Sequence, residues 1–215
     1  ELANRRRGLV MVTGATGSGK STTLAAVVHH INKTRAVHVV TIEDPIEYLH
    51  KDDKARITQR EVGADTASYQ QALRHVVRQS PDVILIGEMR DSESIQVAIA
   101  AALTGHLVLT TLHTIDATQT LQRILNHFPS HLRAQVAMDL SQCLQGIVCQ
   151  RLLPRADESG RILAAEVMHC TPPVARLLRD TRIEELQDLM RASRHPGLRT
   201  FNQALVQLFQ AEAIS

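Results

Sequence analysis

Aromatic side chains are scarce in this 215-residue sequence. Trp is absent, and Phe, Trp and Tyr together make up 2% of the residues. A buried core must therefore be built from aliphatic side chains, and a surface on which nucleic-acid bases stack is not expected. An excess of one charge is also lacking, because the formal net charge is +2 and no long basic run extends beyond Arg5–Arg7. We interpret that run as the solvated entry to a strand, and we expect no direct nucleic-acid partner.

Cysteines and long apolar runs are scarce too. The three cysteines, Cys143, Cys149 and Cys170, are odd in number and form no C-x-x-C pair. This pattern argues against a disulfide scaffold and a four-cysteine zinc site, and is typical of small buried side chains in a reducing compartment. No apolar run approaches the ~20 residues of a membrane span, and no signal peptide is found. We therefore expect a soluble, cytoplasmic protein without a membrane span.

The most informative segment that is present is a glycine-rich loop, which fits the phosphate-binding pattern G-x-x-x-x-G-K-[ST]. It follows the apolar run 8–13 and precedes a helical pattern that begins at residue 22. Such glycines let backbone N–H groups surround a phosphate chain, and the dipole of the following helix adds positive potential. Lys20 can reach the β- and γ-phosphates of ATP, and the Ser21 hydroxyl can ligate Mg²⁺. An accidental glycine-rich turn is the alternative. The predicted nucleotide-binding residues are Gly14, Ala15, Thr16, Gly17, Ser18, Gly19, Lys20, Ser21 and Thr22.

Strand and helix patterns alternate over the first two-thirds of the sequence. Strands are predicted at 9–13, 37–42, 82–87 and 107–112, and helices at 22–32, 68–78, from 92 to the glycine at 105, and 117–126. The third strand has a continuous apolar centre, as strands buried on both faces of a sheet do. The alternation predicts an α/β fold with a mostly parallel sheet and helices on both faces.

The remainder of the sequence has a different pattern. A helix is predicted at 132–144, followed by a β-hairpin whose strands, 147–154 and 161–168, flank the turn Asp157–Gly160. Three short helices follow, of which Thr171 and Thr200 cap the first and the third. We predict a core domain over 1–170 that includes the hairpin near 147–168, and a small helical C-terminal subdomain over 171–215.

Carboxylates and histidines flank several of the predicted parallel strands. Glu43 begins an acidic segment after the second strand, Glu88 follows the third, His113 follows the fourth, and His106 precedes the fourth. Ligands of parallel sheets bind at the carboxyl ends of the strands, and phosphoryl transfer to water needs an oriented nucleophile, Mg²⁺ and donors to the γ-phosphate. We therefore predict catalytic roles for Glu43, Glu88, His106 and His113, and metal ligands at Ser21 and Glu88. Solvated carboxylates and structural imidazoles are the alternatives.

Four of these segments, taken together, resemble a known family. After the Walker A loop, Thr41–Glu47 resembles the Asp box, Pro81–Asp91 the Walker B region, and Thr104–Thr114 the His box of the secretion and type IV pilus ATPases. The order and spacing of the segments are family-like, and the resemblance covers essentially the whole chain. The chain is most similar to the PilT/PilU pilus-retraction branch, because the tetracysteine zinc insertion of the assembly ATPases is missing and the tail Arg194–Leu208 is similar.

The resemblance implies a RecA-like P-loop NTPase core that hydrolyses ATP with Mg²⁺ and powers type IV pilus retraction and twitching motility. It implies a homo-oligomer, usually a hexameric ring, in which arginines act across the subunit interface. The implied partners are an inner-membrane platform protein at the pilus base and a related retraction ATPase, and the implied location is cytoplasmic, peripheral to that membrane. The family's N-terminal PAS-like domain is absent from this sequence, which we interpret as a fragment or a natural truncation. The arginines available for the interface are Arg74, Arg78, Arg90 and Arg123.

Three other functions stay open at this point. A secretion ATPase that moves protein or DNA carries the same motifs. A nucleotide-binding regulatory module would keep the Walker A loop and have little turnover. A small-molecule kinase would need an acceptor pocket, which the sequence does not reveal.

Overall fold

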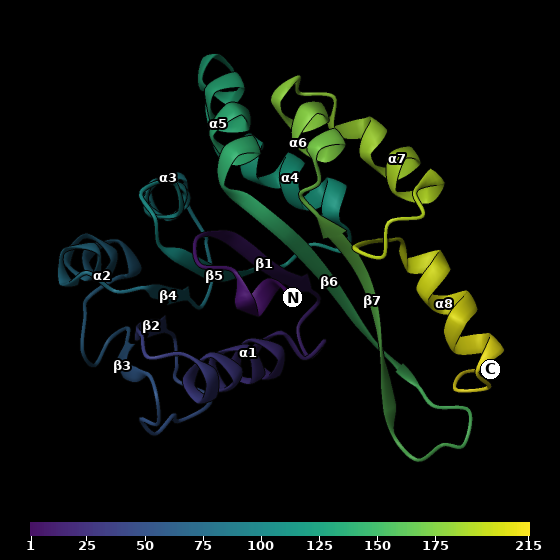
Figure 1. The fold of residues 1–215 in the computed structure, drawn as a ribbon, viewed down its shortest axis with the longest axis horizontal. Helices are drawn as coiled ribbons and strands as arrows, with labels where there is room; N and C mark the ends of the chain where they lie inside the picture. The colour runs from purple at the N-terminus through teal and green to yellow at the C-terminus, as the bar shows by residue number, and fades with distance from the viewer. The chain divides into compact units, whose positions relative to one another are not determined.

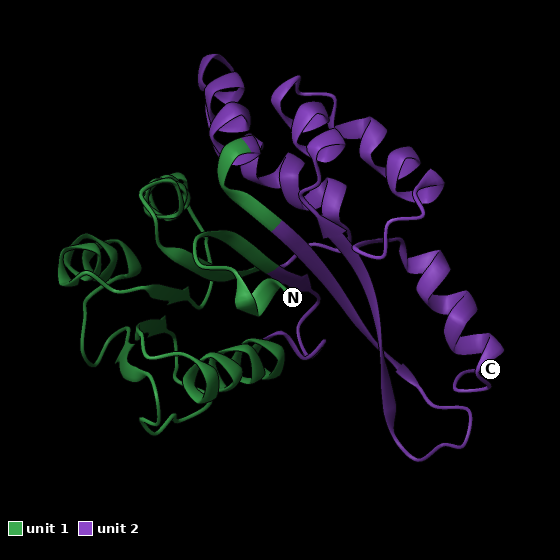
Figure 2. Cartoon of the chain, viewed as in Figure 1, with its two compact units in different colours: residues 1–11, 21–112, 142–145 green, residues 12–20, 113–141, 146–215 purple.

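The computed structural model describes all 215 residues, which form two compact units. Unit 1 comprises residues 1–11, 21–112 and 142–145, and unit 2 comprises residues 12–20, 113–141 and 146–215 (Figure 2). The sequence-based division at residue 170 stays a prediction.

Unit 1 contains the parallel strands. β2 (His38–Glu43) pairs with β3 (Arg56–Glu61) and with β4 (Val83–Ile86), and β4 pairs with β5 (Leu107–Leu112), all in parallel. Every residue of β4 is buried, as its continuous apolar run predicts, and every residue of β5 is buried as well. The helices are α1 (Lys20–Thr34), α2 (Tyr69–Val76) and α3 (Ser92–Leu103), with the short helices η1 (Leu2–Asn4) and η2 (Val77–Gln79).

Unit 2 contains the antiparallel strands. β6 (Leu144–Pro154) and β7 (Arg161–His169) form the predicted hairpin, with Ile147 opposite Met168, and β7 also pairs with β8 (Leu198–Arg199). Thr171 and Thr200 are the N-caps of the helices that follow them. The helices are α4 (Ala117–Asn126), α5 (Ser130–Cys143), α6 (Pro172–Arg179), η3 (Ile183–Glu185), α7 (Leu186–Ala192) and α8 (Phe201–Gln210).

The strands follow the order β3-β2-β4-β5-β1-β6-β7-β8 in one sheet, where β1 is Gly8–Gly14. The chain moves in one direction along the sheet from β1 to β2, and in the opposite direction from β3 to β4 and β5. Right-handed crossovers therefore place α1 on one face of the unit 1 strands and α2 and α3 on the other, as Figure 1 shows. The predicted α/β class with a mostly parallel sheet is confirmed.

The core is aliphatic, as the scarcity of aromatic residues predicts. The largest fully buried side chains are all Leu, Ile or Met, and they include Leu9, Ile42 and Leu109. None of the three cysteines forms a disulfide, and Cys143 and Cys149 are buried. None of the helices combines the length and the apolar character that a membrane-spanning segment needs.

Candidate functional site

The Walker A segment forms a loop between β1 and α1, and its shape depends on glycine. Gly14, the last residue of β1, has a φ angle of +149°. A Cβ at this position would overlap with Ser18 Oγ and with the carbonyl oxygen of Gln150. Gly19, which directly precedes α1, has a φ of +88°, a left-handed conformation that residues with a side chain rarely adopt. The glycines are therefore required by the loop conformation itself.

Lys20 is the first residue of α1, and its side chain turns back over the loop. Its Nζ donates to the carbonyl oxygens of Gly14 and Ala15, each at 3.0 Å. Lys20 is only 8% exposed, so the ammonium is held inside the loop and largely away from solvent. Charges interact more strongly where water is excluded. The loop therefore offers a fixed positive charge together with the N-terminus of a helix, which is a binding site for phosphate oxygens.

Ser21 contacts the acidic segment that follows β2. Its Oγ donates to Glu47 Oε1 at 2.8 Å. In nucleotide sites Mg²⁺ takes oxygen ligands and needs only one or two from protein side chains besides phosphates and water. The hydroxyl and the carboxylate thus fit this ion. The sequence prediction named Ser21 and did not select Glu47, although Glu47 lies in the same acidic segment as Glu43.

Glu43 is the last residue of β2, and neighbouring side chains hold its carboxylate. Oε1 accepts hydrogen bonds from Thr41 Oγ1 at 2.7 Å and from Gln59 Nε2 at 3.2 Å. Thr41 is fully buried, and Gln59 lies on the adjacent strand β3. A carboxylate fixed in this way at the carboxyl end of a strand can accept a hydrogen bond from a water molecule and polarise it.

Glu88 follows β4 and belongs to a charged cluster in unit 1. Arg90 Nε lies 2.7 Å from Glu88 Oε2, and Arg90 Nη1 lies 3.8 Å from Asp44 Oδ2. The hydrogen bond from Arg90 to Glu88, together with the charge of Glu88, raises the pKa of Arg90. Tyr69 borders this cluster, and burial followed by the charge of Asp44 raises the pKa of its phenol to about 12. Tyr69 could not be predicted from the sequence, because a tyrosine at a helix start is not a recognisable catalytic pattern.

The two predicted histidines flank β5 at different ends. His113 directly follows the last residue of the strand, whereas His106 precedes the first, and a strand of this length spans about 20 Å. The ring Nδ1 of His106 lies 3.0 Å from the Ala101 carbonyl oxygen, and its own carbonyl accepts from Gly8 N at 2.9 Å. His106 therefore lies in the connection between α3 and β5, at the amino end of the strand, and its ring and backbone contacts are structural. This placement lends no support to its predicted role at the nucleotide, which stays a prediction.

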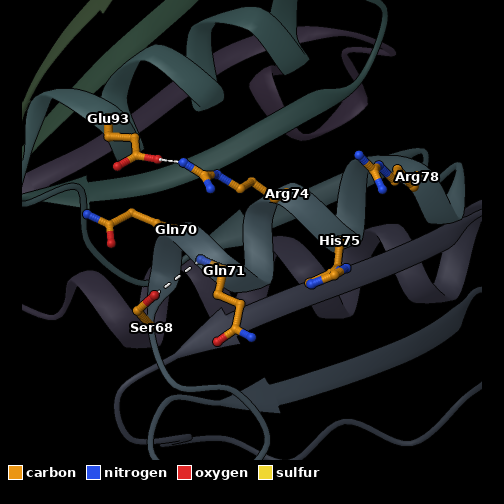
Figure 3. Close-up of a pocket in the computed structure, with 7 residues that line it drawn as sticks. All are labelled: Ser68, Gln70, Gln71, Arg74, His75, Arg78 and Glu93. Carbon is orange, nitrogen blue, oxygen red and sulfur yellow. Dashed lines mark hydrogen bonds and ion pairs between the residues drawn. The ribbon is translucent and has the colours of Figure 1, made fainter.

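The four predicted interface arginines differ in their contacts within the chain. Arg90 is paired with a carboxylate as described, and Arg123 donates to a backbone carbonyl at 3.1 Å. Arg74 on α2 forms an ion pair with Glu93 on α3 (Figure 3). Arg74 and Glu93 line a cavity of about 400 Å³, and Arg78 lines it too. Arg78 has no hydrogen bond or ion pair within the chain. Of the four, Arg78 is the one with an unengaged guanidinium.

Comparisons with known proteins agree with these motifs. The type IV pilus ATPase PilU of Pseudomonas aeruginosa is 49% identical over 209 residues, which are 97% of this chain and 55% of that protein. The type IV pilus retraction ATPase PilT of the same organism is 44% identical over 97% of this chain and 60% of its own length. A crystal structure of the pilus retraction motor PilT with bound ADP has a TM-score of 0.94 and 46% identity, and it matches all of this chain and 61% of that one. This chain therefore spans a little over half the length of these relatives, and its fold is that of the PilT structure.

A family-wide comparison gives the same result over almost the whole chain. The family described as type II/IV secretion system protein matches residues 1–207. Such a match extends far beyond the Walker A loop, which many nucleotide-binding proteins share. The chain belongs to the type II/IV secretion system protein family.

Proposed function

We propose that this chain is the ATP-hydrolysing part of a ring-forming motor, and that it converts ATP and water to ADP and phosphate. The observation that carries the proposal is the Walker A loop, in which the Lys20 ammonium is held against two loop carbonyls. An accidental turn would not need a glycine at position 14, where a Cβ would overlap with its surroundings. The loop thus has both the charge and the backbone geometry of a phosphate site.

Each residue of the proposed site has a separate role. Lys20 binds the β- and γ-phosphate oxygens of ATP, and Ser21 with Glu47 holds Mg²⁺, which neutralises phosphate charge when bound. Glu88 orients the attacking water and accepts its proton, with Glu43 as the second candidate for that role. His113 donates a hydrogen bond to the γ-phosphate and thereby distinguishes ATP from ADP.

We further propose that hydrolysis powers type IV pilus retraction. The support is that PilU and PilT, whose names describe type IV pilus ATPases, match 97% of this chain. In this proposal the protein is a homo-oligomer, a hexameric ring, on the cytoplasmic side of the inner membrane at the pilus base. Its partners there are a platform protein of the inner membrane and a related retraction ATPase.

A secretion-system motor is the second candidate, because the matching family includes secretion proteins. Deleting the gene separates the two. Loss of twitching with secretion intact supports the pilus role, whereas loss of secretion with functional pili supports the secretion role. A regulatory module is the third possibility, and it would bind nucleotide without significant turnover.

The direct test compares Lys20→Ala with Lys33→Ala as a matched control. Lys33 lies on the same helix, but its side chain is 58% exposed and pairs with Asp53 at 3.4 Å. Losing a charged donor to phosphate should weaken binding of a fluorescent ATP analogue by about tenfold or more in Lys20→Ala and leave Lys33→Ala near wild type. Unchanged affinity in Lys20→Ala would refute the nucleotide site, and wild-type binding without phosphate release would favour the regulatory module.

A further inference from the structure

Arg123 and His113 are joined by a hydrogen bond within unit 2. Nη1 of Arg123, in the last turn of α4, donates to the backbone carbonyl oxygen of His113 at 3.1 Å. Both residues also line one open cavity of about 520 Å³. The contact therefore lies at a surface that a ligand can reach, directly after the end of β5.

Helix α4 gives Arg123 a rigid support. Asp116 caps the helix, and the first helical N–H, that of Ala117, donates at 2.8 Å to the buried carboxylate of Glu166. The inner face of the helix is buried and includes Ile124, the neighbour of Arg123 in sequence. A helix that is held at its start and along one face cannot easily shift. The guanidinium consequently restrains the His113 carbonyl relative to a fixed element.

We propose that Arg123 is a positioning residue for His113 in its own chain, and that it does not act on a nucleotide bound by a neighbouring subunit. The inference rests on the proposed function, in which His113 contacts the γ-phosphate. Holding the carbonyl restricts the main chain where it leaves β5 and so limits the directions in which the imidazole points. Without the hydrogen bond from Arg123, the contact between His113 and the γ-phosphate is weakened. ATP has this phosphate and ADP does not, so the binding of ATP is weakened relative to that of ADP.

The first experiment compares three single variants of the intact chain. Arg123→Met removes the donors and keeps the length of the side chain, while Arg123→Lys keeps a charged donor. Arg133→Met is the matched control, because Arg133 also donates to a backbone carbonyl in unit 2, that of Phe128 at 3.0 Å. Affinities for a non-hydrolysable ATP analogue and for ADP are measured for each variant, together with the melting temperature.

We expect Arg123→Met to weaken binding of the ATP analogue about fivefold relative to ADP, which is the effect of one hydrogen bond. Arg123→Lys should restore most of this difference, and Arg133→Met should leave the ratio of the two affinities unchanged. A merely structural role of Arg123 would lower the melting temperature or weaken both nucleotides equally. Equal weakening of both nucleotides, or no weakening of either, would overturn the proposal.

A mixing experiment tests the alternative that Arg123 acts across a subunit interface. Lys20→Ala subunits keep Arg123, and Arg123→Met subunits keep the phosphate loop. If Arg123 served a neighbour, mixing the two proteins would restore turnover; we expect no activity beyond the sum of the separate proteins. Failure of the wild type to bind either nucleotide would refute the proposed function. If the wild type hydrolyses ATP and Arg123→Met keeps the wild-type ratio of the two affinities, only this inference is refuted.

Discussion

Replacement of Glu166 tests how unit 2 is held together. Glu166 lies on β7 and is 2% exposed. Its Oε1 accepts from Ala117 N at 2.8 Å and its Oε2 from Phe201 N at 3.4 Å, which are the first N–H groups of α4 and α8. One buried carboxylate thus satisfies donors at the starts of two helices, where N–H groups have no partner in the helix itself.

The expected loss follows from these two bonds. A hydrogen bond to a charged group contributes about 1.5–3 kcal/mol, and the bond from Phe201 is long, so it counts at the lower end. Glu166→Ala removes both acceptors and leaves two buried N–H groups unsatisfied, so the free energy of unfolding should fall by about 3–5 kcal/mol. Glu166→Gln keeps one acceptor oxygen and also removes a buried charge, so it should cost only about 1–2 kcal/mol.

The pH dependence has a defined sign. Burial raises the pKa of Glu166 above its usual 4.5, and the charge of Asp116 raises it further, against the opposing effect of the Ala117 hydrogen bond. The folded protein therefore binds more protons at this site than the unfolded chain does. Its stability falls as the pH rises from 4.5 through the folded pKa. Glu166→Gln lacks this titration. The free energy of unfolding of the wild type should therefore exceed that of this variant by a smaller amount as the pH rises through that range.

The assay is urea unfolding followed by far-UV circular dichroism, because the chain has no Trp to report by fluorescence. Glu184→Ala is the control, since Glu184 is exposed on η3, and it should change the free energy by less than about 0.5 kcal/mol. The reasoning is refuted if Glu166→Ala costs less than about 1 kcal/mol, or if the advantage of the wild type over Glu166→Gln grows with pH.

The buried parallel strands could be predicted from the sequence because their apolar residues are contiguous. The predicted strand 107–112 and helix 117–126 coincide with β5 and α4. β3 was missed, because Arg56–Glu61 is mostly polar and half-exposed at the edge of the sheet. It is a strand because its backbone pairs with β2, and a contact between distant segments leaves no apolar pattern in the sequence.

The candidate site, like the fold, has one part that the sequence reveals and another part that it does not. The phosphate loop is contiguous in sequence, so its residues could be named with their order and spacing. The contact of Ser21 with Glu47 and that of Glu88 with Arg90 depend on how the connections after β2 and β4 fold, and spacing alone does not reveal them. The sequence predicts Arg90 only as an interface arginine, because sequence alone does not distinguish an arginine that is paired in its own chain from one that is available to a partner.

Three further predictions concern turnover. Glu88→Gln should bind ATP and lose hydrolysis by about 10²-fold or more, because an amide cannot accept the proton of the attacking water; phosphate release within about threefold of wild type would shift that role to Glu43. The specific ATPase activity should also rise with protein concentration, in parallel with light scattering. An arginine from a neighbouring subunit contributes roughly 10³–10⁵ in rate, and Arg78 is the predicted interface arginine whose guanidinium has no partner in its own chain. Arg78→Ala should therefore remove most of the increase without changing assembly. A monomer that is fully active at every dilution would contradict the ring motor, because each active site would then be complete within one chain.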